Sequence, residues 1–219
     1  MGKVSILNSE QKIVLSALAK QKIVISDYYF TGGTALSEIY LHHRDSVDLD
    51  FFSLKPVDQP KITEMLKSCF DALGVTLEMQ FVDPVLMCYL SFPHGKKLKV
   101  DFAQYPYPQL ELSKKHIGNL KVDSLIDIAI NKMQTITQRQ EVKDFVDLYF
   151  LLQKFTFWDL RQGVAEKFRM DIEPLLVSSD FLAVEDFTFL PRMRIPLTLY
   201  ELKVFFRSQA LNLAKTMVE

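Results

Sequence analysis

Three aspartates in strand-like segments are the residues of this sequence best suited to chemistry. Asp48 and Asp50 stand two residues apart in "SVDLDFFSL", and Asp101 stands in "KLKVDFAQY". Because residues two apart on a strand project from the same face, the first two carboxylates are expected side by side, where their like charges repel. A divalent cation removes that repulsion, and Mg²⁺ prefers carboxylate oxygens while keeping water and phosphate as further ligands.

The third acid extends this pattern if its strand neighbours the strand of the first two. Three converging carboxylates form the protein part of a two-metal centre, whose ions lie about 3.5–4 Å apart and flank a phosphoryl group during in-line displacement. An Asp-x-Asp pair alone is common by chance. Two exposed charges at a strand end are therefore the alternative interpretation.

A glycine pair precedes these acids. The aromatic run "YYF" leads into Gly32 and Gly33 and then directly into a predicted helix, "TALSEIYLHH". Such a turn presents backbone N–H groups at the positive end of a helix dipole, which favours phosphate, although a simple tight turn is the alternative. Thr34 either adds its hydroxyl to the phosphate contacts or caps the helix. The glycine turn and the acids together predict a site for a magnesium-bound nucleotide.

The elements that must position these residues form an α/β half followed by a helical half. A first helix is expected to begin after Asn8 or Ser9, and "PKITEMLKSCFDAL" is expected to be a helix that ends at Gly74. The strand-like segments "VTLEMQFV", "VLMCYLSF" and "KLKVDFAQY" follow with short turns, which imply antiparallel pairing within a mixed sheet. Helices are predicted over residues 124–139, 141–152, 158–169, 180–186 and 197–217.

Composition limits the possible partners. The 219 residues carry a formal net charge of −1, so no global basic field indicates a nucleic-acid-binding protein. Cys69 and Cys88 lack metal-ligand spacing and are typical of a reducing, cytoplasmic compartment. No signal-peptide pattern and no apolar run long enough for a membrane span occur, so no membrane association is expected.

The combined motifs resemble those of a known family. "GGTALSEIYLHHRDSVDLDFF" looks like the first motif of the AbiEii/AbiGii abortive-infection toxins, nucleotidyltransferases of the polymerase-β-like superfamily. "KVDF" is similar to the later strand acid of that family, and "IDIAINKMQTITQRQEVKDFVDLYFLL" to its two helical motifs, with a lysine and a "KDxxDL". The resemblance covers the chain from about Tyr28 onward. One departure is the pair His42 and His43, where at most one such residue is expected.

This resemblance implies an α+β fold and an activity. The fold would be that of a polymerase-β-like nucleotidyltransferase, with a mixed, mostly antiparallel sheet flanked by helices. A catalytic core over residues 1–110 would precede a helical domain over residues 111–219. The enzyme would transfer a nucleoside monophosphate from an NTP, with Mg²⁺ and two ions expected, to a hydroxyl of a tRNA end or a protein. It would be the toxin of a toxin–antitoxin pair, with a cognate antitoxin as partner.

The resemblance also implies residue roles. The acids are assigned to the metal ions, and Asp101 also to lowering the pKa of the acceptor hydroxyl. Lys132 would contact phosphate or stabilise transition-state charge, with a solvent-directed lysine as the alternative. Asp144 would be functional, although a salt bridge from Asp144 or Asp147 to Lys132 or Arg139 is an open alternative.

Four residues border the acidic strand. Arg44 would grip a phosphate or offset the acidic cluster, and Ser46 is assigned with it to nucleotide binding. His42 and His43 point in different directions on a helix, so surface or capping roles are expected for them.

Two other functions are compatible with the sequence. A nucleotide-binding regulatory module without turnover is the main alternative, and a metal-dependent phosphodiesterase is a third. An RNA acceptor would require a local basic surface, for which the helical half offers candidates: Lys154, Arg161, Lys167, Arg169, Arg192 and Arg194.

Overall fold

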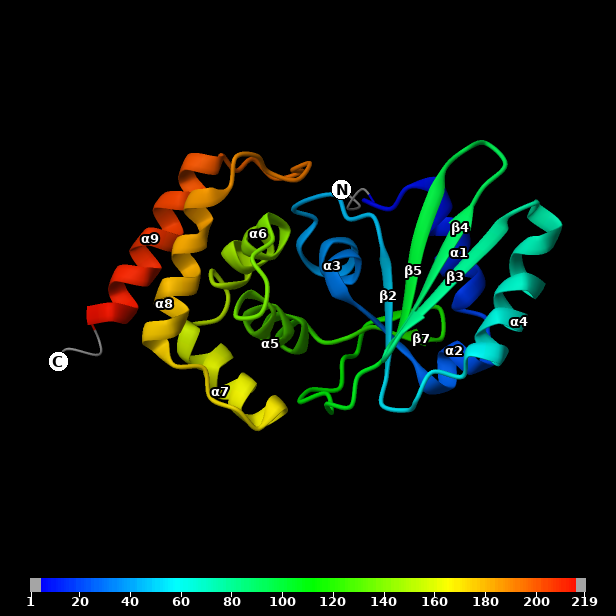
Figure 1. The fold of residues 1–219 in the computed structure, drawn as a ribbon, viewed down its shortest axis with the longest axis horizontal. Coiled ribbons are helices and arrows are strands. Elements are labelled where there is room, and N and C mark those ends of the chain that lie inside the picture. Colours follow the sequence, from blue (N-terminus) through cyan, green and yellow to red (C-terminus); the bar gives the residue numbers. More distant parts are fainter. Residues whose placement is uncertain (1–4, 216–219) are drawn as a thin grey trace. The chain divides into compact units, whose positions relative to one another are not determined.

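The structure is a computed structural model that describes residues 5–215 (Figure 1). The chain divides into two compact units. The first comprises residues 5–42 and 46–124, and the second comprises residues 43–45 and 125–215. Residues 111–124 thus group with the first unit, and three residues between the glycine pair and the acidic strand group with the second.

A five-stranded mixed sheet forms the centre of the first unit, in the order β1-β2-β5-β4-β3. The strands are β1 (Tyr29–Thr31), β2 (Leu49–Ser53), β3 (Thr76–Val82), β4 (Val85–Ser91) and β5 (Lys97–Gln104). The pair β2 and β5 is parallel and the other neighbours are antiparallel, which confirms the predicted mixed sheet. A small hairpin, β6 (His116–Ile117) and β7 (Leu120–Lys121), was not predicted.

The helices of the first unit begin and end at recognisable signals. They are α1 (Ser9–Leu18), α2 (Lys22–Asp27), α3 (Gly32–Ala35), its π-helical continuation η1 (Leu36–Leu41), α4 (Gln59–Phe70) and the 3₁₀ turn η2 (Asp71–Leu73). The side chain of Asn8 accepts a hydrogen bond from the Gln11 N–H in a capping box at the start of α1. Gly74 ends the α4 region with φ +66°, as the sequence predicted. The π-helical turn was not predicted.

The two faces of the sheet have different characters. Alternate residues of β2 and β5 bury their side chains on one face, where Phe51 and Phe102 are fully buried and stack with ring centroids 5.1 Å apart. Phe30 joins them, with its centroid 5.5 Å from that of Phe51. The opposite face carries the acids, because side chains alternate along each strand.

The second unit is helical in its described residues. Its helices are α5 (Leu125–Ile136), α6 (Val142–Leu151), α7 (Phe157–Phe168), α8 (Pro174–Leu182), the 3₁₀ turn η3 (Ala183–Asp186) and α9 (Leu199–Lys215). Phe145 and Phe181 each pack edge-on against Phe206 in its core. The sequence predicted all of these regions except the first turns of α8. The predicted end of the last helix at Met217 lies outside the described residues.

No helix within residues 5–215 is long and apolar enough to span a membrane.

Candidate active site

Asp50 and Asp101 are brought together by the register of the parallel strands β2 and β5. The two residues are register partners, as are Phe51 and Phe102 one position further along. Register partners project from the same face of strands about 4.8 Å apart, so the two carboxylates lie side by side. A one-residue slip of β2 against β5 would move Phe51 to the opposite face and away from Phe102. Burial of the two rings therefore also fixes the two acids next to each other.

Asp101 is largely enclosed. Its side chain is 14% exposed, and Lys99 Nζ donates to its Oδ2 at 2.5 Å. Burial raises the pKa of Asp101 above its usual value; the charge of Asp48 acts in the same direction, and the hydrogen bond from Lys99 opposes it. The second oxygen, Oδ1, is buried and has no hydrogen-bond partner among the described residues. A buried carboxylate oxygen without a partner is unusual and indicates a position for a ligand.

Gly32 lies against Asp50. A Cβ atom at this position would come within 2.1 Å of Asp50 Oδ2, and the glycine has φ +74°, a conformation that other residues rarely adopt. Thr31, the preceding residue, is the register partner of Asp50 across β1 and β2. The predicted turn therefore requires glycine for two reasons, its backbone conformation and its approach to a carboxylate.

Thr34 and Asp48 are joined directly. The Thr34 hydroxyl donates to the backbone carbonyl of Asp48, so it does not cap the helix; the N-cap residue is Thr31. Asp48 itself lies one residue before β2 rather than inside the strand. The contact fixes the segment that carries Asp48 to the start of α3.

A buried cluster of charges occupies the second unit. Lys132 Nζ lies 2.7 Å from Asp144 Oδ1 and 2.7 Å from Asp147 Oδ2, and Arg139 Nε lies 3.0 Å from Asp144 Oδ2. Burial opposes the charge of Lys132, but the two carboxylates outweigh it and raise the pKa of the lysine. The salt-bridge alternative is thus present in the structure, and Asp144 and Asp147 do share one face of α6.

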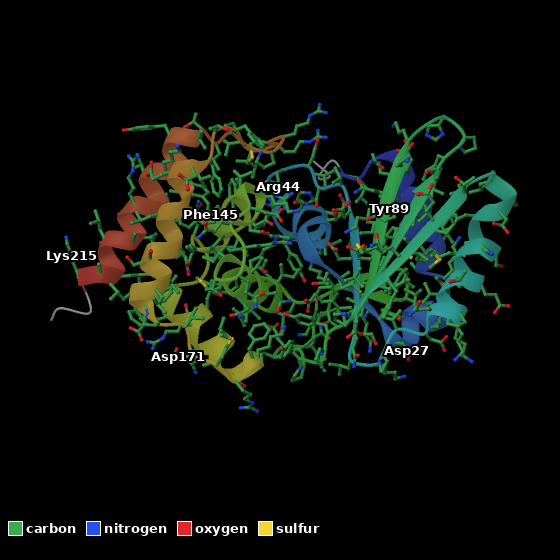
Figure 2. All side chains as sticks on the ribbon, viewed as in Figure 1. Asp27, Arg44, Tyr89, Phe145, Asp171 and Lys215 are labelled. Carbon is green, nitrogen blue, oxygen red and sulfur yellow. The ribbon has the colours of Figure 1, made fainter. Side chains whose placement is uncertain are left out.

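Arg44 and His43 belong to the same cluster. Arg44, labelled in Figure 2, donates from Nε to Asp147 Oδ1 at 2.6 Å and from Nη2 to Oδ2 at 2.8 Å. His43 Nε2 donates to Asp147 Oδ1 at 2.7 Å, and burial lowers the pKa of this histidine against the opposing effect of Asp147. Burial works against the Asp147 carboxylate, yet Lys132 and Arg44 hold its pKa well below the usual value. The expected surface role of His43 is wrong, because its side chain is fully buried.

The remaining predicted residues have local contacts. His42 ends η1 in the left-handed region, with φ 50° and its N–H bonded to the Ser37 carbonyl, as a capping residue does. The Ser46 carbonyl accepts a hydrogen bond from Gln11 Nε2 at 2.8 Å. Lys167 cannot contribute to a basic surface, because it is buried against Asp127, with Nζ 2.7 Å from Oδ1.

Lys99 is a site residue that the sequence analysis did not single out. Its position two residues before Asp101 in one strand places both side chains on one face. That spacing was the available signal.

The fit to a metal ion rests on the donors of the first unit. Within residues 5–215, no group of three or more His, Cys, Asp or Glu side chains is gathered closely enough to hold an ion. Asp50 and Asp101 are adjacent, however, and the unpartnered oxygen of Asp101 is a hard donor of the kind that Mg²⁺ prefers. Asp50 and Asp101 therefore fit a divalent cation as two neighbouring carboxylates. The charge of Asp48 acts on Asp101, but the expected gathering of all three acids is not present among the described residues.

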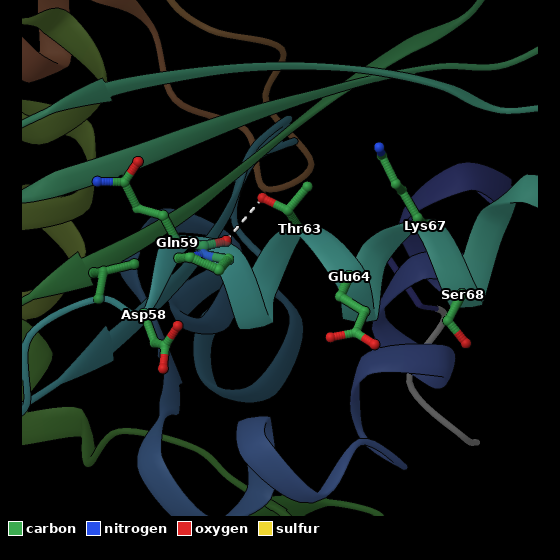
Figure 3. A pocket seen from close by; sticks show the side chains of 8 residues that line it. Asp58, Gln59, Thr63, Glu64, Lys67 and Ser68 are labelled. Carbon is green, nitrogen blue, oxygen red and sulfur yellow. Dashed lines mark hydrogen bonds between the residues drawn. The ribbon is translucent and has the colours of Figure 1, made fainter.

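A cavity of about 1000 Å³ lies elsewhere in the first unit, along α4 (Figure 3). Its lining includes Gln59, Thr63 and Lys67 and none of the acids described above. It is therefore a separate feature from the acidic site.

The fold is that of a nucleotidyltransferase. The crystal structure of JHP933 from Helicobacter pylori is similar with a TM-score of 0.58 at 18% identity, covering 96% of this chain and 94% of that one. MenT4, a nucleotidyltransferase toxin from Mycobacterium tuberculosis H37Rv, is similar with a TM-score of 0.55 at 16% identity, covering 92% of this chain and 82% of that one.

The sequence shows the family. Residues 14–208 match the family described as "Nucleotidyl transferase AbiEii toxin, Type IV TA system". An uncharacterized protein of Aquifex aeolicus (strain VF5), aq_aa25, is 34% identical over 159 residues, 71% of each chain. The chain belongs to the AbiEii family and is a nucleotidyltransferase, which confirms the resemblance and the predicted fold class. Enzymes of this kind use an NTP and a divalent metal ion, and the toxin–antitoxin family implies an antitoxin partner.

Proposed function

We propose that this nucleotidyltransferase transfers a nucleoside monophosphate to a hydroxyl of a tRNA end or a protein, as the toxin of an abortive-infection-type toxin–antitoxin pair. The adjacency of Asp50 and Asp101 on one sheet face, with a buried oxygen of Asp101 lacking a partner, is the observation that supports it most. In the reaction, the acceptor oxygen bonds to the α-phosphorus and its proton passes to solvent. The bond from that phosphorus to the bridging oxygen breaks, and pyrophosphate leaves.

The metal ligands of this proposal are Asp48, Asp50 and Asp101, with Mg²⁺ as the ion and two ions expected. When bound, the ions neutralise charge on the phosphates and on the attacking and leaving oxygens. Asp101 Oδ1 also accepts a hydrogen bond from the acceptor hydroxyl and so orients its oxygen towards the α-phosphorus. Lys99 holds the other oxygen of Asp101 and thereby fixes the direction in which Oδ1 points.

Gly32 and Gly33 bind the triphosphate in this proposal. Their backbone N–H groups lie at the start of α3, where an anion is favoured, and neither residue has a side chain to block it. Thr34 acts as a positioning residue, because its hydroxyl donates to the Asp48 carbonyl. Ser46 holds the same segment through its carbonyl rather than through its hydroxyl.

Lys132, Asp144 and Arg44 belong to the buried charge cluster of the second unit and not to the acidic site of the sheet. Their charges are already satisfied by one another and by Asp147 within the second unit. A contact of Lys132 or Arg44 with phosphate, and a catalytic role for Asp144, stay predictions. We propose that their first role is to hold α5, α6 and residues 43–45 together.

Nucleotide transfer to an unbiased acceptor pool tests the proposed reaction. The purified chain is incubated with each of the four α-labelled NTPs and MgCl₂, with total tRNA in one series and a protein extract in another. Label is expected on macromolecules in one series. The Asp50→Asn variant is expected to lose at least about 100-fold in rate, because several kcal/mol of charge stabilisation depend on the metal ligands and each 1.36 kcal/mol is tenfold.

A matched control separates chemistry from folding. Asp27→Asn removes an aspartate of the same unit that pairs with Lys55 at the surface, and its transfer rate should equal that of the unmodified chain. Undiminished transfer by Asp50→Asn would reject the site. Tight NTP binding without label on any acceptor would favour the non-transferring nucleotide-binding module instead.

A further inference from the structure

Strand β3 forms an open edge of the sheet. Among the described residues β3 pairs only with β4, and all of its seven residues are exposed or half-exposed. Proteins usually protect such an edge with Lys, Pro, a bulge or a covering segment, because its free N–H and C=O groups can pair with another strand. The sequence of β3, "TLEMQFV", contains no Lys, Arg, Pro or Gly, and Glu78 is its single charge.

The opposite edge of the same sheet is closed by the chain itself. Strand β1 is only three residues long, and Phe30 forms a parallel bridge with Val122. The Asp123 N–H also donates to the Phe30 carbonyl at 2.8 Å. The contrast leaves β3 as the long, unprotected edge.

We propose that β3 pairs with β3 of a second copy of this chain, antiparallel about a two-fold axis at Met79, so that the sheet continues across a homodimer. This register places Leu77 opposite Phe81 and Glu78 opposite Gln80. Residues directly opposite each other lie on the same face, so apolar side chains meet apolar ones. The one charge of the strand meets a neutral amide, and no like charges are opposed. The strand is therefore complementary to itself, which selects a second copy as its partner.

The side chains of this pairing lie beside exposed apolar surface. Leu77, Met79 and Phe81 are register partners of Leu90, Cys88 and Leu86, which are buried on the core face of the sheet. Phe81 is nevertheless 40% exposed, and Val82 on the other face is 53% exposed. A second β3 strand would cover both of these side chains and satisfy the backbone groups of the edge.

The cavity along α4 lies next to the same strand. Thr63, which lines it, contacts Met79 of β3, with Oγ1 3.3 Å from Sδ. Figure 3 shows Gln59, Thr63 and Lys67 projecting from one side of α4, and Glu64 and Ser68 from the other. The lining contains charges of both signs, which suits a surface that meets its own copy.

Charge changes at residue 80 test the register, because residue 80 of each copy lies opposite Glu78 of the other copy. A symmetric dimer therefore contains this pair two times. The dimer dissociation constant is measured by sedimentation velocity on the full chain. Gln80→Glu is expected to raise it roughly 2- to 30-fold, and Gln80→Lys to lower it by a similar factor, from the usual size of opposed charge pairs. Gln153→Glu, the same change at an exposed position of the second unit, should leave it unchanged.

Several results would overturn the proposal. A wild-type chain that stays monomeric at every concentration would overturn it, even if another partner binds the edge of β3. A dimer whose dissociation constant changes in the same direction and by the same factor with Gln80→Glu and Gln80→Lys would also overturn it. A dimer that responds to neither change would also overturn it. Residue 80 is exposed, so unchanged thermal unfolding of dilute variants would show that they fold normally.

Disulfide trapping tests the axis independently, in a Cys69→Ser and Cys88→Ala background, because Cys88 is the register partner of residue 79 in the same chain and would compete for its thiol. Met79→Cys should form a covalent dimer under mild oxidation, because the axis puts residue 79 opposite itself. Glu78→Cys alone should not, but it should cross-link when mixed with Gln80→Cys. Equal trapping at all positions, or none at Met79→Cys, would contradict the register. This inference does not depend on the proposed reaction.

Discussion

At the scale of single residues, the site combines Asp101, an acid that is costly to bury, with Gly32, whose lack of a side chain leaves room for the Asp50 carboxylate. Burial disfavours the charged form of Asp101 and raises its pKa, and one of its oxygens has no hydrogen-bond partner among the described residues. Gly32 lets the chain pass Asp50 at a distance that no other residue allows. Both features favour a bound cation and phosphate over a purely structural acid pair.

A substitution at Gly32 separates the close approach from backbone strain. Gly32→Ala is expected to lose at least about 100-fold in nucleotide transfer, because its Cβ would displace Asp50, one of the proposed metal ligands. The measurement is the transfer rate together with urea unfolding. Gly95→Ala is the matched control, since Gly95 also has positive φ, +85°, but nothing lies within 4 Å of its added Cβ.

The control makes the outcome specific. The left-handed conformation should cost each variant about 1–2 kcal/mol of stability, and the contact with Asp50 should add to the loss of Gly32→Ala. Only Gly32→Ala should lose activity. Equal activity in the two variants would show that the approach of Gly32 to Asp50 has no part in the reaction.

At the scale of elements, the helices α5 and α6 are joined by charge as well as by apolar packing. Lys132 on α5 contacts both Asp144 and Asp147 on α6, which stand one turn apart. Breaking a buried ion pair by removing one partner leaves an uncompensated charge and costs about 3–5 kcal/mol. The cluster is therefore expected to stabilise the helical unit whether or not Lys132 also meets a phosphate.

A double-mutant cycle measures this contribution. Lys132→Met should destabilise the chain by about 3–5 kcal/mol in urea unfolding. Adding Asp144→Asn should cost less than the two single changes together, with a coupling of about 0.5–3 kcal/mol, because the second change removes a carboxylate that the first left with Arg139 as its remaining cationic partner. Additive losses would contradict the contact. Wild-type stability of Lys132→Met would contradict the structural role altogether.

The sequence predicted elements better than it predicted their boundaries and pairings. Alternation in "SVDLDFFSL" and "KLKVDFAQY" predicted two strands and the faces of their acids, but only the crossover that makes β2 and β5 parallel neighbours places Asp50 beside Asp101. Pro174 begins α8 at a position where a proline is favoured, and that start was missed because the following residues lack a clear apolar period. The buried partners of His43 and Arg44 could not be predicted, since Asp147 lies more than a hundred residues away in the sequence.

At the scale of the whole molecule, the chain alternates between its two units. Residues 43–45 lie in sequence between Gly32 and Asp50, yet they pack in the second unit, where Arg44 and His43 bond to Asp147. Asp45 is held there as well, through Arg194. A short segment thus connects the glycine turn and the acidic strand to the helical unit, so the intact chain is the proper object for tests of the site.

The measurement that tests the central claim most directly is Mn²⁺ binding to the intact chain, followed by electron paramagnetic resonance with a non-hydrolysable NTP analogue present. The unmodified chain and Asp27→Asn should bind the ion with equal, saturable affinity. Asp101→Asn should weaken binding by at least about tenfold, because it removes a ligand of the ion. Binding by Asp101→Asn that equals that of the unmodified chain would contradict the claim that the adjacent acids of β2 and β5 form the metal site.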